Sequence, residues 1–313
     1  MNELILHHYD TSPFSEKVRL ILGHKGLAWR SVEVPRVMPK PDVVALTGGY
    51  RRTPFLQIGA DIYCDSALMA RVIDRLHPAP PLYPASAGPV QHVLAHWADS
   101  ALFWSAIPYT MQPVGAAHIF AGAPPEVVRA FAVDRAAMTQ GMRRPTPADA
   151  TAVLGTYLDW LEGMLGDDRA WLCGAEPCIA DFSVAQSPWF IRRAPPVAGV
   201  LALYPRLASW YERMAGFGHG QPQPMDSAEA LEVAAASTGH APAAVAEGGG
   251  FAAGADVVVC ATDYGSDPVE GRLVGLDADE VVLVRDDTRA GRVHVHFPRI
   301  GYQIKPAPAK DTP

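Results

Sequence analysis

Ser12 lies at the junction between a short apolar run, residues 4–8, and a helical pattern that begins near Pro13. Free backbone N–H groups and the positive end of the helix dipole favour an anion at such a junction. A hydroxyl that donates a hydrogen bond there would stabilise a thiolate, whose parent thiol has an ordinary pKa of about 8.5. Ser12 is therefore a candidate for activating a thiol. The alternative is that Ser12 only caps the helix; Ser15 and Tyr9 are weaker candidates for the donor.

A second polar pair, Asp65 and Ser66, precedes the helical pattern of residues 67–76. A carboxylate and a hydroxyl beside free N–H groups suit the amino and carboxylate groups of an amino acid. Helix capping alone explains such a pair in most proteins, so both interpretations stay open.

The elements that position these residues follow the order βαβαββα within residues 1–80, which predicts an α/β domain whose first two strands are parallel neighbours. Residues 86–217 are almost wholly helical in period and predict a second, all-helical domain. Its helices are expected at residues 90–107, 125–142, 147–165, 179–190 and 204–214.

The last part of the chain has a different composition. Residues 218–254 are rich in Gly, Ala, Pro and Ser and predict a linker with one helix at 227–236. Residues 255–306 contain short β-branched runs separated by Asp and Gly turns. This pattern predicts a small antiparallel β domain, barrel-like, of unknown role.

The composition limits the partners. Hydrophobic residues make up 49% and charged residues 19% of the 313 residues, which excludes a disordered chain. The net charge of −7 disfavours nucleic acid as a partner. No apolar run approaches the length of a membrane span, the N-terminus lacks the pattern of a signal peptide, and the four cysteines form no CxxC pair. We expect a cytoplasmic protein with reduced thiols and no membrane contact.

Several motifs occur in a defined order. They are Tyr9-Asp10-Thr11-Ser12-Pro13-Phe14-Ser15-Glu16-Lys17-Val18-Arg19, Arg52-Thr53-Pro54-Phe55-Leu56, Cys64-Asp65-Ser66 and Tyr204-Pro205-Arg206-Leu207. Their order and separations resemble a cytosolic glutathione S-transferase of the serine type, with a tau/omega-like N-terminal motif, over residues 1–217. The resemblance implies a thioredoxin-like glutathione-binding domain followed by an all-helical substrate domain.

The resemblance also implies a role for each motif. Ser12 matches the catalytic serine of the family's serine-using classes. Thr53 and Pro54 match the position of a cis-proline whose preceding backbone pairs with the cysteinyl part of glutathione. Asp65 and Ser66 match the γ-glutamyl site. Two basic residues, Lys40 and Arg52, lie where the family often binds the glycyl carboxylate.

Three aromatic residues of the first long helix are candidates for an acceptor-substrate pocket: Trp97, Trp104 and Tyr109. A stripe at this spacing is equally compatible with a helix core. In the helical domain, Cys178 stands where the family's capping motif with Asp181 normally has a hydroxyl, and this departure weakens the cap.

No metal and no nucleotide is expected. His294 and His296 alternate on a presumed strand, but no carboxylate or cysteine lies at a convincing spacing from them. The glycines at 248–250 neither follow a strand nor open a helix, so they predict no phosphate site.

The leading hypothesis is a homodimeric detoxification enzyme that conjugates the glutathione thiolate to small hydrophobic electrophiles. The alternative is a non-catalytic binding or scaffold protein whose C-terminal β domain is an interaction module. A third interpretation, glutathione-dependent reduction, requires an active-site thiol. The nearest cysteine in sequence is Cys64, and reduction gains support only if that thiol is exposed beside the glutathione site.

Overall fold

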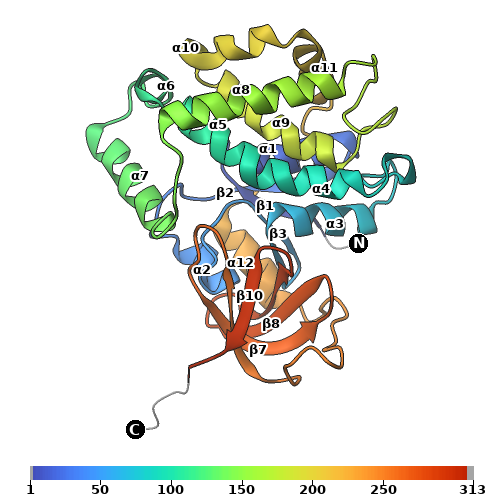
Figure 1. Ribbon diagram of the computed structural model, residues 1–313. Coiled ribbons are helices and arrows are strands. Elements are labelled where there is room, and N and C mark those ends of the chain that lie inside the picture. The colour runs from blue at the N-terminus through green and yellow to red at the C-terminus, as the bar shows by residue number, and fades with distance from the viewer. Residues whose placement is uncertain (1–2, 309–313) are drawn as a thin grey trace.

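The computed structural model describes residues 3–308. A helical domain lies at one end, a thioredoxin-like domain lies in the middle, and a strand-rich C-terminal unit lies at the other end (Figure 1). This arrangement confirms the predicted fold class of residues 1–217 and places the extra unit against the thioredoxin-like domain.

The thioredoxin-like domain has the predicted order of elements. They are β1 (Ile5–His8), α1 (Pro13–His24), β2 (Ala28–Glu33), α2 (Pro41–Thr47), β3 (Phe55–Ile58), β4 (Asp61–Cys64) and α3 (Ser66–Leu76). Strand β1 pairs in parallel with β2 and antiparallel with β3, and β3 pairs antiparallel with β4. The loops at the start of α1 and α3 therefore bring Ser12 and Asp65 to the same end of the domain.

The helical domain contains α4 (Val90–Trp97), α5 (Phe103–Thr110), α6 (Pro113–Ile119), α7 (Pro125–Met138), α8 (Pro147–Met164), α9 (Ile179–Arg192), α10 (Pro195–Ala198) and α11 (Pro205–Ala215). The single helix predicted at 90–107 is divided into α4 and α5 by a π-helical turn at Ala98–Leu102. Such turns occur frequently at functional sites, and this one carries Asp99. Within residues 3–308, none of the helices is both long and apolar enough to span a membrane.

The C-terminal unit consists of β6 (Asp256–Ala261), β7 (Val269–Leu276), β8 (Glu280–Asp287), β9 (Gly291–Pro298) and β10 (Tyr302–Pro306). Its strands pair antiparallel, as predicted, in the order β10-β6-β7-β8-β9. The sheet is open and does not close into a barrel, because β9 pairs in parallel with β4. The two sheets thus form one ten-stranded sheet.

Residues 218–254, which the sequence presents as a linker, contribute two elements. Strand β5 (Gln221–Pro224) pairs in parallel with β2, and α12 (Ser227–Ala236) contacts α2 and β9. The predicted helix at 227–236 is present. This segment runs from one edge of the thioredoxin-like sheet to the C-terminal unit (Figure 1).

Two hydrophobic cores lie on opposite faces of the thioredoxin-like sheet. One joins α1 and α3 to the helical domain. The other joins α2 and β3 to the C-terminal strands, through residues such as Leu46, Phe55, Leu273, Leu283 and Phe297. Because the second core is shared, the C-terminal unit is packed against the first domain and not merely tethered to it.

The start of α9 shows how the cysteine in the capping motif is tolerated. The buried carboxylate of Asp181 accepts hydrogen bonds from the backbone N–H groups of Leu172 and Cys178, both at 2.9 Å, and from Nε1 of Trp210 at 2.8 Å. The acidic half of the motif therefore anchors the helix to its surroundings without a hydroxyl at residue 178.

We expect Asp181→Ala to lower the free energy of unfolding by about 2–4 kcal/mol, because three buried donors lose their acceptor. Urea denaturation measures the change. The control is Glu232→Ala, an exposed position on α12, which should change stability by less than about 0.5 kcal/mol. Equal stability of the two variants would contradict this account.

Candidate functional site

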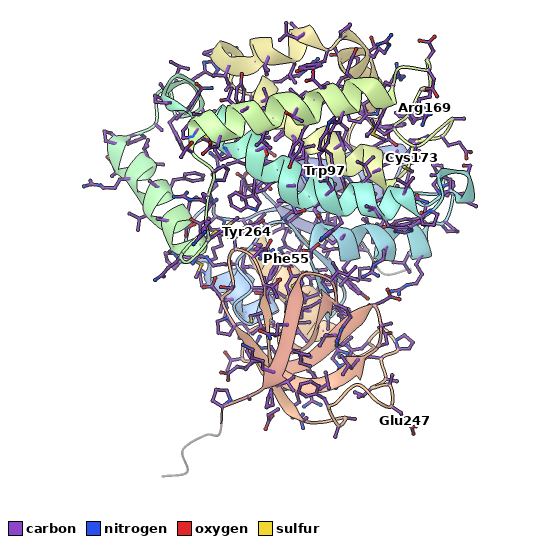
Figure 2. All side chains as sticks on the ribbon, viewed as in Figure 1. Phe55, Trp97, Arg169, Cys173, Glu247 and Tyr264 are labelled. Carbon is purple, nitrogen blue, oxygen red and sulfur yellow. The ribbon has the colours of Figure 1, made fainter. Side chains whose placement is uncertain are left out.

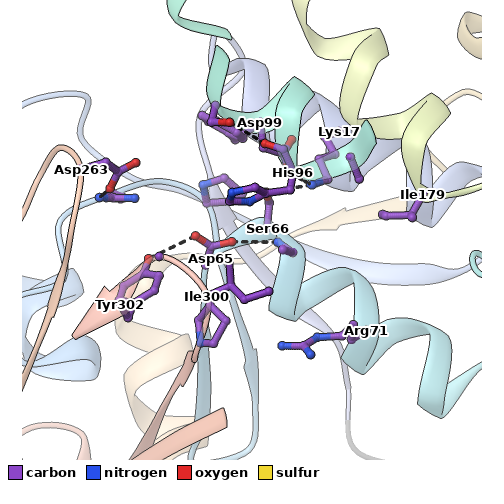
Figure 3. A pocket seen from close by; sticks show the side chains of 18 of the residues that line it. Lys17, Asp65, Ser66, Arg71, His96, Asp99, Ile179, Asp263, Ile300 and Tyr302 are labelled. Atoms are coloured by element: carbon purple, nitrogen blue, oxygen red, sulfur yellow. Dashed lines mark hydrogen bonds and ion pairs between the residues drawn. The ribbon is translucent and has the colours of Figure 1, made fainter. Parts of the chain in front are cut away.

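A cavity of about 200 Å³ lies where the three units meet. Thr53, Pro54, Asp65 and Ser66 of the thioredoxin-like domain line it. The helical domain and the C-terminal unit complete its wall, with His96, Asp99, Asp263, Tyr264 and Tyr302 among the lining residues (Figure 3). Its volume is below the roughly 300–1,000 Å³ of typical ligand pockets. The pocket is therefore narrow in this conformation.

Thr53 and Pro54 form one wall of the cavity, just before β3. The peptide bond between them is cis. The carbonyl of Thr53 accepts a hydrogen bond from Oγ of Ser12 at 3.3 Å. The structure thus joins the candidate thiol-activating residue to the segment with the cis-proline.

Ser12 lies behind this wall and does not line the cavity. Its side chain caps α1, because Oγ accepts from the backbone N–H of Ser15 at 3.2 Å. The residue is only 2% exposed. The capping role that the sequence left open is therefore present, and the hydroxyl would have to leave Thr53 before it could donate to a bound thiolate.

Asp65 and Ser66 sit at the N-terminus of α3 and face the cavity. Asp65 caps the helix by accepting from the N–H of Ala67 at 2.9 Å, and its other oxygen accepts from the hydroxyl of Tyr302 at 3.2 Å (Figure 3). The backbone of Asp65 has a φ of +76°, a region that costs a non-glycine residue about 1–3 kcal/mol and is frequent at binding sites. This backbone conformation directs the carboxylate of Asp65 and the free N–H groups at the start of α3 toward the cavity.

A buried ion pair forms the floor beside Ser66. Nζ of Lys17 lies 2.5 Å from a carboxylate oxygen of Asp99 and 3.2 Å from Oγ of Ser66. Asp99 also accepts from Ser183 and Gln186 of α9. Burial raises the pKa of Asp99, while the charge of Lys17 acts in the opposite direction. This network fixes the helical domain against Ser66 at the start of α3.

Arg52 is held by the C-terminal unit. Its guanidinium donates to the carboxylate of Asp263 and the carbonyl of Tyr264, and it lies 4.0 Å from the centre of the Tyr264 ring. Burial opposes its charge, but the surrounding tyrosines and Asp263 raise its pKa above the ordinary value. Tyr264 lies between the helical domain and the C-terminal unit (Figure 2). With Tyr302 on Asp65, the C-terminal unit roofs the cavity.

Lys40 lies close to Thr53 but does not line the cavity. Its Nζ donates to the carbonyl of Arg51 at 3.2 Å and to Oγ1 of Thr53 at 3.3 Å. Burial lowers the pKa of Lys40 from 10.5 to about 8. The ammonium is therefore charged at neutral pH. It contacts Thr53, whose peptide bond to Pro54 is cis.

The three aromatic candidates do not come together. Trp97 packs edge-on against Tyr157 at 4.9 Å, and the hydroxyl of Tyr109 donates to the carbonyl of Val197 at 2.8 Å. Both residues belong to the helical core, because the face of the helix that carries them turns away from the cavity. Only Trp104 approaches the site, edge-on to Tyr264 at 5.2 Å.

Five residues of the site had no sequence signal strong enough to be selected: Lys17, Asp99, Asp263, Tyr264 and Tyr302. Lys17 and Asp99 sit within helical patterns where charged residues usually face solvent. Asp263, Tyr264 and Tyr302 belong to the C-terminal unit, and local sequence patterns do not show where that unit docks. Lys17 belongs to the motif of residues 9–19, but the motif does not indicate that its side chain is buried.

The reduction hypothesis depends on Cys64, which is fully buried in β4. Burial raises the pKa of its thiol well above the ordinary value. In Cys173, by contrast, the hydrogen bond with Cys178 lowers the pKa of the thiol, and the residue is partly exposed. The exposed thiol that would favour reduction is thus not provided by Cys64.

We expect iodoacetamide at pH 8 to modify Cys173 in the native protein at least tenfold faster than Cys64, because only an accessible thiolate reacts. Peptide mass spectrometry after timed quenching measures both rates. A Cys64 rate equal to that of Cys173 would contradict the buried assignment.

The comparisons with known proteins match the first two domains of the chain. Residues 6–81 match the glutathione S-transferase N-terminal domain, and residues 130–213 match the glutathione S-transferase C-terminal domain. No curated protein matches the sequence significantly.

Solved structures extend the comparison to the C-terminal unit. A GST-like protein from Pseudomonas syringae is 41% identical, covers 98% of this chain and 100% of its own, and has a TM-score of 0.81. A glutathione S-transferase from Rhodospirillum rubrum F11 is 20% identical, with 68% of this chain and 87% of its own covered and a TM-score of 0.52. One from Methylobacterium radiotolerans, in complex with glutathione sulfonate, is 19% identical, with 71% and 97% covered and a TM-score of 0.51.

The last two similarities show the fold alone, whereas the first spans all three units. The chain therefore belongs to the glutathione S-transferase family and carries an additional C-terminal domain.

Proposed function

We propose that this protein binds glutathione in the roofed cavity and transfers its thiolate to an electrophile. The observation that carries the proposal is the convergence of the cis Thr53–Pro54 segment and the Asp65–Ser66 pair on one cavity. Family membership adds support, because the family is a glutathione-using one.

The polar groups in and beside the cavity match those of the tripeptide. The carboxylate of Asp65 would bind the α-ammonium, and Oγ of Ser66 with the N-terminus of α3 would bind the α-carboxylate. Lys40 or Arg52 would bind the glycyl carboxylate. Since Lys40 carries its charge below a pKa of about 8, it can serve this role at neutral pH.

Ser12 would supply the chemistry. Its hydroxyl donates to the Thr53 carbonyl over 3.3 Å, a long hydrogen bond that costs little to exchange. In the complex the same hydroxyl would donate to the glutathione sulfur, lower the pKa of the thiol and favour the thiolate. The thiolate then attacks the electrophile, forming the sulfur–carbon bond as the leaving group departs with its electron pair.

The acceptor is proposed to be a small hydrophobic electrophile. Phe14, Ile179 and Ile300 give the cavity wall an apolar component beside its charged groups.

We further propose a cytoplasmic homodimer with a role in detoxification. The exposed side chains of Val90 and Val93 on α4, 54% and 69% accessible, support a self-association surface.

A second candidate function, a non-catalytic binding or scaffold protein, is favoured by one observation. Asp263 and Tyr302 already engage Arg52 and Asp65, two proposed glutathione ligands. If Asp263 and Tyr302 always stay bound to Arg52 and Asp65, the cavity binds no tripeptide.

We expect Ser12→Ala to lower kcat by roughly 10²-fold or more while changing the glutathione Kd less than threefold, because its hydroxyl acts mainly on the thiolate. The assay pairs glutathione with 1-chloro-2,4-dinitrobenzene, and thiolate absorbance against pH gives the thiol pKa in the complex. Ser12→Thr, which keeps the hydroxyl, should retain most activity. An unchanged thiol pKa in Ser12→Ala would remove this residue from the mechanism.

We expect Asp65→Ala to weaken glutathione binding at least tenfold, measured by isothermal titration calorimetry, because the α-ammonium loses its carboxylate. Asp226→Ala is the control, since the carboxylate of Asp226 also caps a helix, α12, but lies outside the cavity. Tyr302→Phe should leave affinity equal or tighter, because it frees Asp65. Unchanged affinity in Asp65→Ala would count against the γ-glutamyl assignment.

A further inference from the structure

A second group of ligating side chains lies away from the roofed cavity, where the C-terminal unit joins the thioredoxin-like domain. It consists of Asp61 on β4, His294 on β9 and His240 in the segment after α12. Asp61 and His294 are register partners in the parallel β4–β9 pair. One potential ligand atom from each of the three residues lies within 4.8 Å of the others. The pairing of β4 with β9 thus places the carboxylate of Asp61 beside His294, although the two residues are far apart in sequence.

The two histidines are arranged face to face. Their ring centroids are 3.7 Å apart and their planes differ by 11°. Nδ1 of His240 lies 3.4 Å and Nδ1 of His294 lies 3.8 Å from the same oxygen of Asp61. Both Nδ1 atoms are buried, yet neither makes a hydrogen bond. Two buried ring nitrogens without partners beside one carboxylate require an explanation, because buried polar atoms are nearly always paired.

Asp61 itself is held in place from outside this group. One oxygen accepts from Nε2 of His296 at 3.0 Å, and the other accepts from the backbone N–H of Ala241 at 2.8 Å. Nδ1 of His296 is hydrogen-bonded in turn to Glu280. Partners of this kind orient the carboxylate ligands of metal sites.

We propose that Asp61, His240 and His294 form a binding site for a divalent transition-metal ion, with Zn²⁺ as the best fit. Two imidazole nitrogens and one carboxylate oxygen are ligands that zinc prefers, whereas Mg²⁺ and Ca²⁺ prefer oxygen alone. Tetrahedral zinc with ligands at about 2.0–2.1 Å places neighbouring ligand atoms about 3.3 Å apart. The two nitrogen–oxygen distances need only small adjustments to reach this value, and one of the two stacked rings must rotate so that both nitrogen lone pairs point at the ion.

The surroundings leave room for a fourth ligand. The two ligating nitrogens are buried, but the rest of the side chains of His240 and His294 are 18% and 14% exposed, so a water ligand would approach the ion past the edges of these rings. The three protein ligands come from the thioredoxin-like domain, the connecting segment and the C-terminal unit. The ion therefore stabilises the joined arrangement of all three, since an ion that binds the folded chain raises its stability. This inference does not depend on the proposed glutathione chemistry.

The test is a Zn²⁺ titration of the untagged full-length protein after chelator treatment, monitored by competition with a chromogenic chelator. We expect one ion per chain for the wild type. His240→Ala and His294→Ala should each weaken binding at least tenfold. The control His118→Ala, an exposed histidine on α6, should bind as the wild type does.

Two further readouts separate ligation from folding. Co²⁺ should give visible absorption bands typical of a tetrahedral site in the wild type and not in His240→Ala, while circular dichroism shows that the variant is folded. Zn²⁺ should raise the Tm of the wild type and leave that of His240→Ala unchanged. Absence of saturable binding, or equal affinity in folded His240→Ala and the wild type, would overturn the proposal.

Discussion

The parallel pairing of β4 with β9 joins the C-terminal unit to the thioredoxin-like domain. It continues the thioredoxin-like sheet into the C-terminal strands, so that the two units share one sheet and one hydrophobic core. A strand edge that would otherwise expose unpaired backbone groups is thereby covered. The same pairing fixes the position of every C-terminal side chain relative to the cavity at the start of α3.

Two consequences follow at the two ends of β4. After its last residue, Tyr302 and the loop with Asp263 and Tyr264 reach Asp65 and Arg52 and roof the cavity. At its first residue, Asp61 meets His294 and His240. In this account the third unit contributes directly to the glutathione site, and the metal would strengthen the joint that holds it there.

The sequence predicted local structure well wherever local signals decide it. The Asp-Thr-Ser-Pro turn before α1 and the Asp65–Ser66 pair before α3 were located because capping and helix-dipole effects act over a few residues. The aromatic residues of α4 and α5 were ambiguous, because the π-helical turn between them changes which face meets the cavity. Lys17, Tyr264 and His240 were missed for a different reason: their partners are distant in sequence. The helical domain brings Asp99 to Lys17, and docking of the C-terminal unit brings Tyr264 and His240 to their partners.

Hydrogen exchange of the full-length protein, with and without saturating glutathione, shows whether the roof takes part in glutathione binding. We expect slower exchange in two places at once, the start of α3 at residues 65–68 and the roof at residues 263–265 and 300–303. Slowing at α3 alone would contradict a roof that takes part in binding. No slowing at either place would contradict a glutathione site in this cavity.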